Sequence, residues 1–161
     1  MKEKWKSLLV SIAVPLAIGG ISALLTKDSM QQYQQLPQPP LSPPSQIFPI
    51  VWSILFLLMG VSSWLIWETN GSQEISPSRR DSGLNIYIFQ LIVNFLWPIF
   101  FFRAGWFGFS FLWLLLLLFL VILMILRFSS VSKTAALLQI PYLLWLLFAG
   151  YLNLSIFLMN L

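Results

Sequence analysis

Five long apolar segments limit the folds available to this chain more than any other feature of its sequence. They lie at about 7–26, 45–67, 84–103, 106–127 and 134–159. Each has about 20 residues or more, which suffices to cross about 30 Å of hydrocarbon as a helix. Only 9% of the 161 residues are charged, whereas a soluble domain carries about a quarter. The sequence therefore predicts an all-α integral membrane protein, a five-transmembrane-helix bundle that forms a single membrane domain over 1–161.

The first apolar segment follows Lys2, Lys4 and Lys6, so its beginning resembles a secretory signal peptide. Its apolar run is longer than the core of a usual signal peptide, and no small-x-small cleavage site precedes the loop that follows. We therefore expect this segment to remain in the membrane as a helix.

Lysine and arginine are distributed unequally between the two ends of the expected bundle. Seven of the nine lie on the side of the N-terminus, and Lys27 and Arg103 lie on the other side. Because positively charged loops stay on the cytoplasmic side, we expect the N-terminus in the cytoplasm and the C-terminus outside. The loop at 27–44 then lies on the outer surface. Arg103 and Arg127 are expected to extend from helix ends toward the lipid head groups.

Cysteine and histidine do not occur in this sequence. Disulfides, zinc sites of the usual kind, thiolate nucleophiles and imidazole bases are therefore excluded. We expect no metal site and no resident cofactor. The lysine and arginine residues form no basic face, so a nucleic-acid partner is not expected.

The loop at 27–44 holds half of the ten prolines of the chain. Proline fixes φ and lacks an N–H group, so we expect a stiff, extended loop that enters neither helix nor sheet. It leads into the 45–67 segment, where Phe48, Trp52, Phe56 and Met59 recur on one helical face. A stiff lid above an aromatic face predicts a covered pocket.

Two further segments carry polar and aromatic residues that contact with lipid does not explain. They are Gln90, Asn94, Trp97 and Phe101 in 84–103, and Pro141, Trp145, Ala149 and Asn153 in 134–159. Amide side chains in hydrocarbon are costly without a partner, so Asn94 and Asn153 should face the bundle interior. There each could contact a ligand or bridge two helices, and the sequence favours neither.

The helical rise places Trp52, Trp97, Asn94 and Ala149 at similar depths in the outer half of the membrane. A cavity lined by such residues suits a flat, conjugated, mostly apolar ligand. Tryptophan also anchors proteins at membrane interfaces. That role is favoured for the tryptophans near helix ends, namely Trp5, Trp64, Trp67, Trp106 and Trp113.

Two helices are expected to contribute structure rather than a site. The leucine-rich run at 112–120 predicts a lipid-facing wall. Gly19, Gly20 and Ala23 form a small-residue face on the first segment, which favours close helix packing and, most simply, a homodimer.

Taken in sequence order, the motifs of the loop and of the 45–67, 84–103 and 134–159 segments resemble those of the tryptophan-rich sensory protein/translocator protein (peripheral benzodiazepine receptor) family. The matching residues are Tyr33, Leu36, Pro39, Pro43 and Pro44 in the loop, then Phe48, Trp52, Met59 and Gly60, then Leu91, Asn94, Trp97, Phe101 and Phe102, and finally Pro141, Tyr142, Trp145, Phe148, Ala149, Leu152 and Asn153. Two positions depart from the family pattern, because Gln32 and Leu41 stand where aromatic residues are usual. The lid is therefore expected to pack less tightly or to accept a different ligand.

The resemblance implies a five-helix bundle, commonly dimeric, that binds porphyrins and benzodiazepine-type ligands beneath the first loop. It implies a bacterial cell membrane as the location. Carried over residue by residue, the ligand contacts are Tyr33, Phe48, Trp52, Asn94, Trp97, Trp145 and Ala149. Some bacterial members are associated with light-dependent breakdown of protoporphyrin, and Trp52 and Trp145 would be the tryptophans relevant to that chemistry.

Four functions remain open at this stage. The first is a membrane receptor or sensor that binds porphyrins (tetrapyrroles) and regulates a porphyrin or stress response. The second is a light-dependent porphyrin-degrading enzyme. The third is a small-molecule transporter, which the missing internal repeat and the missing intramembrane acidic residue disfavour. The fourth is a scaffold for partner proteins.

Overall fold

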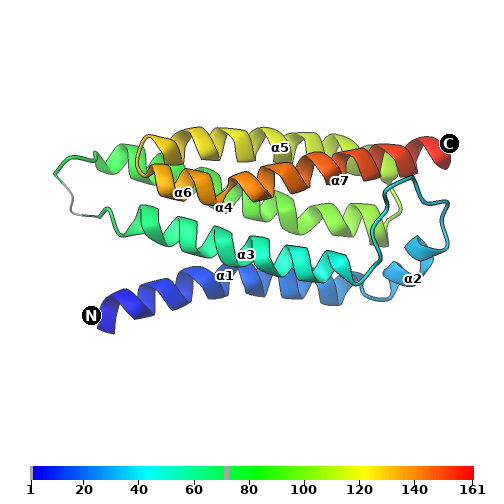
Figure 1. The fold of residues 1–161 in the computed structure, drawn as a ribbon, viewed down its shortest axis with the longest axis horizontal. Coiled ribbons are helices and arrows are strands. Elements are labelled where there is room, and N and C mark those ends of the chain that lie inside the picture. The colour runs from blue at the N-terminus through cyan, green and yellow to red at the C-terminus, as the bar shows by residue number, and fades with distance from the viewer. Residues whose placement is uncertain (1, 71–72) are drawn as a thin grey trace.

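A computed structural model describes residues 2–70 and 73–161, and all regular structure within these residues is helical. Five of its helices are long and apolar enough to cross a membrane. The long helices lie side by side and nearly parallel to one axis (Figure 1). The expectation of an all-α bundle with five transmembrane helices is thus confirmed.

The elements follow in sequence order along the bundle (Figure 1). They are α1 (Lys2–Thr26), α2 (Ser29–Gln34), α3 (Ile47–Trp67), α4 (Pro77–Pro98), the π-helix η1 (Ile99–Arg103), α5 (Phe107–Ser129), α6 (Lys133–Leu138) and α7 (Ile140–Met159). Below, the loop end is the end that carries α2, and the N-terminal end is the opposite one.

The third span begins seven residues before the expected position 84, because its first two turns are polar. Ser76 caps α4 by accepting a hydrogen bond from the Arg79 backbone N–H at 3.4 Å, and Pro77 occupies the first turn. Both are helix-start signals that do not depend on hydropathy. Apolar content alone therefore places the start too late.

The last span is divided at Gln139 into α6 and α7. Pro141 has no N–H group to bond the carbonyl of Leu137, so the α-helical ladder is interrupted there. The Gln139 N–H instead bonds the Ala136 carbonyl at 3.1 Å, which tightens the end of α6.

The first loop differs from the expected extended segment, because α2 lies within it. Its six residues precede the first proline of the loop, so proline chemistry does not forbid a helix there. The backbone from Pro37 onward leaves the helix, as expected. Leu41 has a φ of 68°, in the left-handed region that non-glycine residues seldom adopt.

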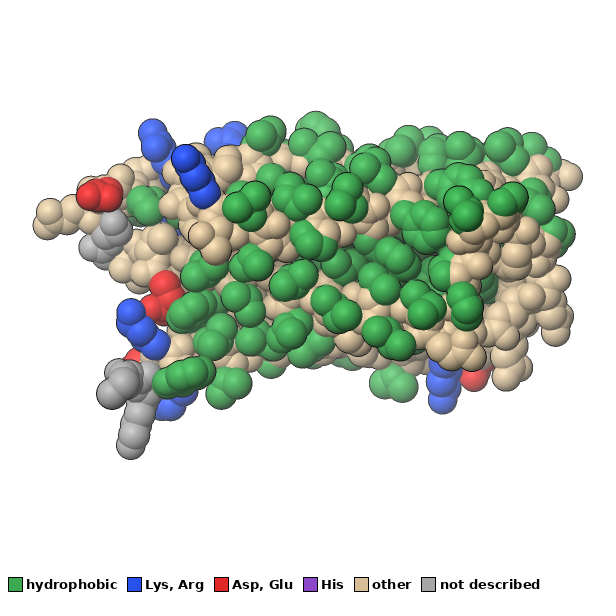
Figure 2. Space-filling view, viewed as in Figure 1, with side chains coloured by type: hydrophobic (Ala, Val, Ile, Leu, Met, Phe, Trp, Pro, Cys, Tyr) green, Lys and Arg blue, Asp and Glu red, His purple; other side chains and the backbone are tan. Residues whose placement is uncertain are grey.

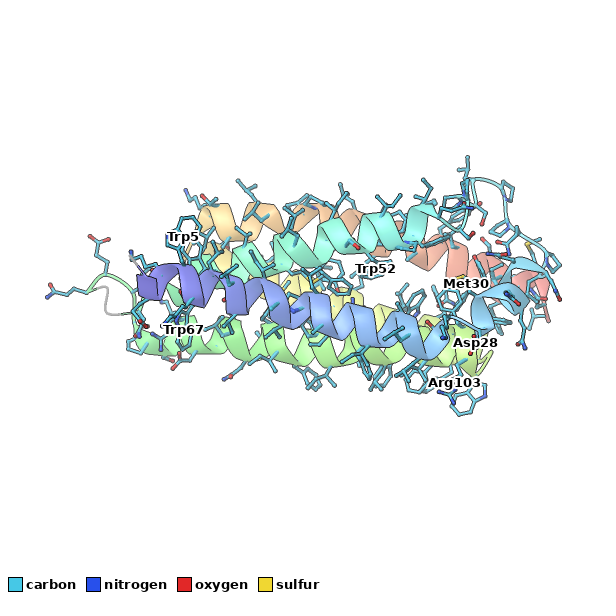
Figure 3. All side chains as sticks on the ribbon, turned by 90° about the horizontal axis from the view of Figure 1, so that it is seen from below. Trp5, Asp28, Met30, Trp52, Trp67 and Arg103 are labelled. Carbon is cyan, nitrogen blue, oxygen red and sulfur yellow. The ribbon has the colours of Figure 1, made fainter. Side chains whose placement is uncertain are left out.

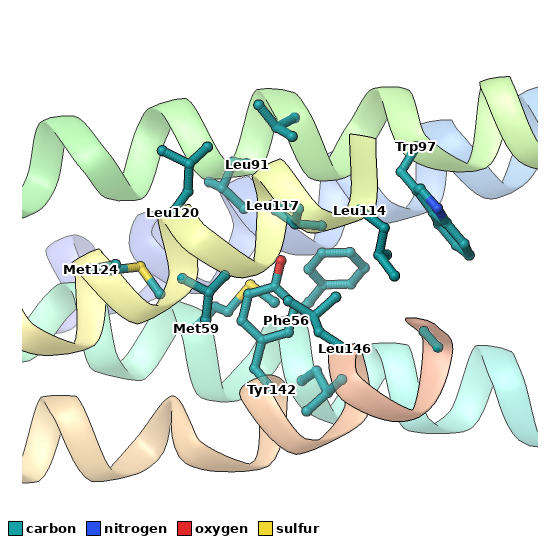
Figure 4. Close-up of a cluster of buried hydrophobic side chains, with 14 of the residues drawn as sticks. Phe56, Met59, Leu91, Trp97, Leu114, Leu117, Leu120, Met124, Tyr142 and Leu146 are labelled. Carbon is teal, nitrogen blue, oxygen red and sulfur yellow. The ribbon is translucent and has the colours of Figure 1, made fainter. Parts of the chain in front are cut away.

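The prediction that 112–120 forms a lipid-facing wall is wrong for one face of α5. Leu114 and Leu117 are buried, whereas Leu112 and Leu115 are exposed. Helix α5 packs against both α4 and α7, so alternate sides of its leucine run meet protein and lipid. Figure 4 shows the buried side of this run facing Tyr142 and Leu146 of α7.

The least buried helix is α1, which packs mainly on α3. Two glycines allow this approach. A Cβ on Gly60 of α3 would lie 2.5 Å from the Ile12 Cα, and one on Gly19 of α1 would overlap the Phe56 ring. Gly20 faces open space, so the small-residue face of α1 is only partly used within the chain.

The surface follows the pattern expected of a membrane-embedded bundle. Hydrophobic side chains cover its length, and the charged side chains visible on this face gather at its two ends (Figure 2). With five spans of sufficient length, this is an integral membrane protein.

Candidate functional site

Helices α3 and α7 face each other with aromatic side chains. Trp52 stacks on Phe56 with ring centroids 5.5 Å apart and meets the Tyr142 ring edge-on at 6.1 Å. Phe48 meets Trp145 edge-on at 6.0 Å. We call these five residues the aromatic row. Trp52 itself lies between the two ends of the bundle, away from Trp5 and Trp67 at the N-terminal end (Figure 3).

The aromatic row is only partly enclosed. Phe56 and Tyr142 are buried, whereas Phe48, Trp52 and Trp145 remain half-buried. The indole Nε1 atom of Trp145 is buried without a hydrogen-bond partner among the described residues. Buried indole N–H groups usually find an acceptor. The row therefore combines open aromatic surface with a hydrogen-bond donor that the protein leaves unused.

A short chain of hydrogen bonds joins α4 to the aromatic row. The Asn94 amide donates to the Tyr142 hydroxyl at 2.7 Å, and that hydroxyl donates to the Gln90 carbonyl oxygen at 2.9 Å. All three side chains are buried. The side chain of Asn94 thus faces the interior, as expected, and it bridges two helices. Its amide orients the Tyr142 ring that forms part of the row.

A second aromatic group, the loop-end cluster, consists of Tyr33, Trp97, Phe101 and Phe102. Trp97 stacks on Phe101 at 5.2 Å, and Tyr33 packs edge-on against Phe102 at 5.1 Å. Trp97 lies one helical turn beyond Asn94 on α4, so α4 connects this cluster to the aromatic row. Burial raises the pKa of the Tyr33 phenol above its ordinary value of 10.0, which a hydrogen bond with Ser42 opposes.

Asn153 makes three hydrogen bonds within the bundle. Its amide oxygen accepts hydrogen bonds from Trp97 Nε1 at 3.1 Å and from the Ser110 hydroxyl at 3.2 Å, and its amide nitrogen donates to the Phe107 carbonyl at 2.8 Å. Of the two possibilities left open by the sequence, Asn153 therefore takes the bridging one, holding α4, α5 and α7 together.

The first loop is held against the last helix. The Tyr151 hydroxyl donates to the Pro40 carbonyl at 2.7 Å, across 111 positions of sequence. The Gln38 amide donates to the Tyr33 carbonyl at 2.9 Å, which fixes the turn after α2. Tyr33, which belongs to the α2 part of this loop, is buried. These hydrogen bonds hold the first loop over the end of the bundle that carries α2.

The structure divides the seven predicted ligand residues between two groups of ring contacts. Phe48, Trp52 and Trp145 belong to the aromatic row, and Tyr33 and Trp97 belong to the loop-end cluster. Asn94 connects the two groups, and Ala149 is buried one turn from Trp145 on α7. Their role in ligand binding stays a prediction.

Sequence reasoning left three contributors out of the ligand set. Tyr142 and Gln90 orient the interior of the site, and Tyr151 holds the loop. Tyr142 and Gln90 each lie one helical turn before a predicted residue, Trp145 and Asn94, so helical spacing could have found them. No local signal connects Tyr151 to Pro40.

The sequence pattern of the TspO/MBR family matches residues 11–159. This chain belongs to that family.

Family relatives from different domains of life share most of the chain. Tryptophan-rich protein TspO of Chlorobaculum tepidum is 32% identical over 99% of this chain and 99% of its own. The protein of the same name from Archaeoglobus fulgidus is 37% identical, covering 95% of this chain and 96% of the relative. Translocator protein of Ovis aries is 36% identical over 78% of this chain and 73% of the relative. The family match at 11–159 covers the helices that carry both aromatic groups, so the TspO/MBR assignment applies to the whole bundle.

Proposed function

We propose that this TspO/MBR family protein is a membrane receptor or sensor that binds porphyrins and benzodiazepine-type molecules at the aromatic row. The supporting observation is that the row is partly open. Half-buried Trp52 of α3 contacts Tyr142 of α7, and half-buried Trp145 of α7 contacts Phe48 of α3. Aromatic rings attract flat conjugated ligands by stacking and by apolar contact. The free indole N–H of Trp145 offers a hydrogen bond to a ring nitrogen or carbonyl of such a ligand.

We also propose an orientation for the protein in the membrane. The N-terminal end faces the cytoplasm of a bacterial cell and the loop end faces outward, in accord with the arginine and lysine distribution. Because the chain has no cysteine, single cysteine substitutions test this orientation directly. A membrane-impermeant maleimide should label Ser42→Cys in intact cells and should label Ser132→Cys only after lysis. The reverse pattern would contradict the orientation.

Binding is tested by titrating protoporphyrin into the detergent-solubilised protein in the dark while tryptophan fluorescence is recorded. We expect saturable quenching that weakens in Trp52→Phe and in Trp145→Phe. Trp67→Phe is the matched control, because Trp67 is exposed at the opposite end of the bundle (Figure 3). Equal affinity in all four proteins would remove the aromatic row as the binding site.

A second candidate function is light-dependent porphyrin breakdown, which the two half-buried indoles favour. Indole can donate an electron to an excited porphyrin, with dioxygen as the terminal oxidant. Illumination of the complex should then convert protoporphyrin to a defined product in wild type and more slowly in Trp52→Phe and Trp145→Phe. Equal bleaching rates in all three would leave the sensor as the function.

We further propose a homodimer that uses the exposed part of the small-residue face of α1. Gly20 and Ala23 remain exposed, whereas Gly19 is occupied by Phe56. Small residues allow helix backbones to approach closely in membranes. Gly20→Leu should shift the protein toward the monomer in light scattering with detergent correction. A dimer that persists in this variant would exclude this face.

A further inference from the structure

A small hollow opens at the loop end, beside the loop-end cluster. Its volume is about 180 Å³. Residues from α2, η1 and the start of α5 form its walls, among them Tyr33, Phe101, Phe102, Arg103 and Phe107. The hollow thus joins four aromatic rings to one guanidinium group. The aromatic row is different, because its ring contacts include no charged side chain.

The backbone of η1 explains why these groups meet. The Ala104 N–H bonds the Ile99 carbonyl at 2.9 Å, five residues back, and the Trp106 N–H bonds the Phe100 carbonyl at 3.0 Å. Gly105 reverses the chain with a φ of 66°. The extra residue of a π-helix turn changes the face on which the following side chains lie, and such turns are frequent at functional sites. Phe101 contacts Tyr33 and Trp97, while Arg103 reaches the rim of the same hollow.

Within 2–70 and 73–161, no ion pair neutralises Arg103. The ion pairs among the described residues involve Lys4, Lys6 and Arg80, and none includes Arg103. Asp28 lies at the same end of the bundle (Figure 3) but is not among the residues that line the hollow. A guanidinium beside aromatic rings can bind a planar carboxylate by donating two parallel hydrogen bonds to it. Arg103 is exposed, so its guanidinium is accessible to a ligand from outside the bundle.

We propose that this hollow is a carboxylate-recognition subsite, in which Arg103 binds an acidic side chain of an otherwise flat, aromatic ligand. The ring system of that ligand would lie toward Trp97 and the aromatic row. This inference rests on the proposed function and narrows its ligand class to conjugated molecules that carry a carboxylate, such as dicarboxylic porphyrins. The carboxylate stays near water at the end of the bundle, where its desolvation is least costly.

The experiment compares protoporphyrin with its dimethyl ester, which has the same ring system and no charge. Dark quenching titrations are run on wild type, Arg103→Gln, Arg103→Lys and Lys27→Gln in a nonionic detergent. Lys27 is the matched control, since it is a cation at the same end that does not line the hollow. Size-exclusion profiles show that each variant is folded.

We expect wild type to bind the acid more tightly than the ester by about two- to fivefold, the usual scale for an ion pair at an exposed guanidinium. Arg103→Gln should abolish this preference while leaving ester affinity unchanged. Arg103→Lys should keep part of it, and Lys27→Gln should keep all of it.

Three results would overturn the subsite. They are equal affinities for acid and ester in wild type, an acid preference that survives Arg103→Gln, and an acid preference that Lys27→Gln removes equally. In each of these cases porphyrin binding itself stands. Failure of wild type to bind either compound would instead overturn the proposed function, and the subsite with it.

Discussion

The core near the N-terminal end and the aromatic row are both built from large apolar residues, but they differ in how completely these residues are enclosed. Met59, Val121, Met124 and Phe128 have no exposed surface. Phe48, Trp52 and Trp145 are half-buried, and an indole N–H is left without a partner. In the core near the N-terminal end, these side chains are enclosed by other parts of the protein. In the aromatic row, part of their surface stays available for contact with another molecule.

Matched phenylalanine substitutions test this contrast most strongly. Phe128→Ala removes a ring with no exposed surface that packs on Tyr87 and beside Gly83. We expect a loss of about 3–5 kcal/mol in the free energy of unfolding, the usual cost for such a cavity. Phe48→Ala should cost less than half as much, because that ring is half-buried. Thermal unfolding in detergent measures both, and equal losses would break the comparison.

The contact between α1 and α3 gives the next largest effect. Gly60→Ala puts a methyl group against the backbone of Ser11 and Ile12, so the helices must separate, at a cost of about 1–3 kcal/mol. Gly20→Ala meets nothing within the chain, so in the monomer it should raise the melting temperature slightly, since alanine favours helix over glycine. A Gly20→Ala monomer that is destabilised as much as Gly60→Ala would break the comparison, whereas a loss confined to the dimeric fraction would support the homodimer proposed on this face.

Tyr142 joins the aromatic row to α4 through its hydroxyl. Tyr142→Phe leaves Asn94 and Gln90 without that shared partner, which should cost about 1–3 kcal/mol. Because the ring remains, the contact with Trp52 should persist. Thermal unfolding reports the stability loss, and porphyrin titration should change less than in Trp52→Phe. A neutral substitution would mean that water replaces the hydroxyl.

Gln139 is an exception within the tightly packed region. Its side chain has no exposed surface, and neither of its polar atoms has a hydrogen-bond partner among the described residues. Gln139→Met keeps the length of the side chain and removes the desolvation cost, so unfolding should become less favourable by about 1 kcal/mol. Loss of stability on thermal unfolding would show that the amide has a bound partner in solution.

The smallest effect concerns Tyr33 and pH. Its pKa is raised by burial, so the folded protein favours the neutral phenol over the phenolate. The contribution of Tyr33 to stability is complete below the ordinary value of 10.0 and is lost as pH rises through the higher folded value. Tyr33→Phe should lack this alkaline loss in a pH series of melting temperatures. An identical pH profile would place the phenol in water.

Hydropathy predicted the five spans because apolar length is a property of each segment alone. It could not find the polar start of α4 at Pro77, which depends on the Ser76 cap, or the buried side of the leucine run in α5, which depends on α4 and α7. The prolines marked where the first loop leaves the helix but not that α2 precedes them.

Within the site, residue type and helical spacing located the side chains but not their partners. Asn153 and Asn94 were expected in the interior and lie there. That both bridge helices depends on Ser110 and Tyr142, which lie 43 and 48 positions away from them. Such pairings follow from how helices pack against each other, and one sequence contains no record of that.

The hydrogen bond from Tyr151 to Pro40 has a consequence for the order in which the protein is made. It ties the first loop to the last helix, across 111 positions. During synthesis, the loop leaves the ribosome long before α7 does, so this contact can form only after the final span has entered the bilayer. The first loop is therefore fastened only once α7 is in place, and a nascent chain stalled before α7 would hold four spans with an unfastened loop.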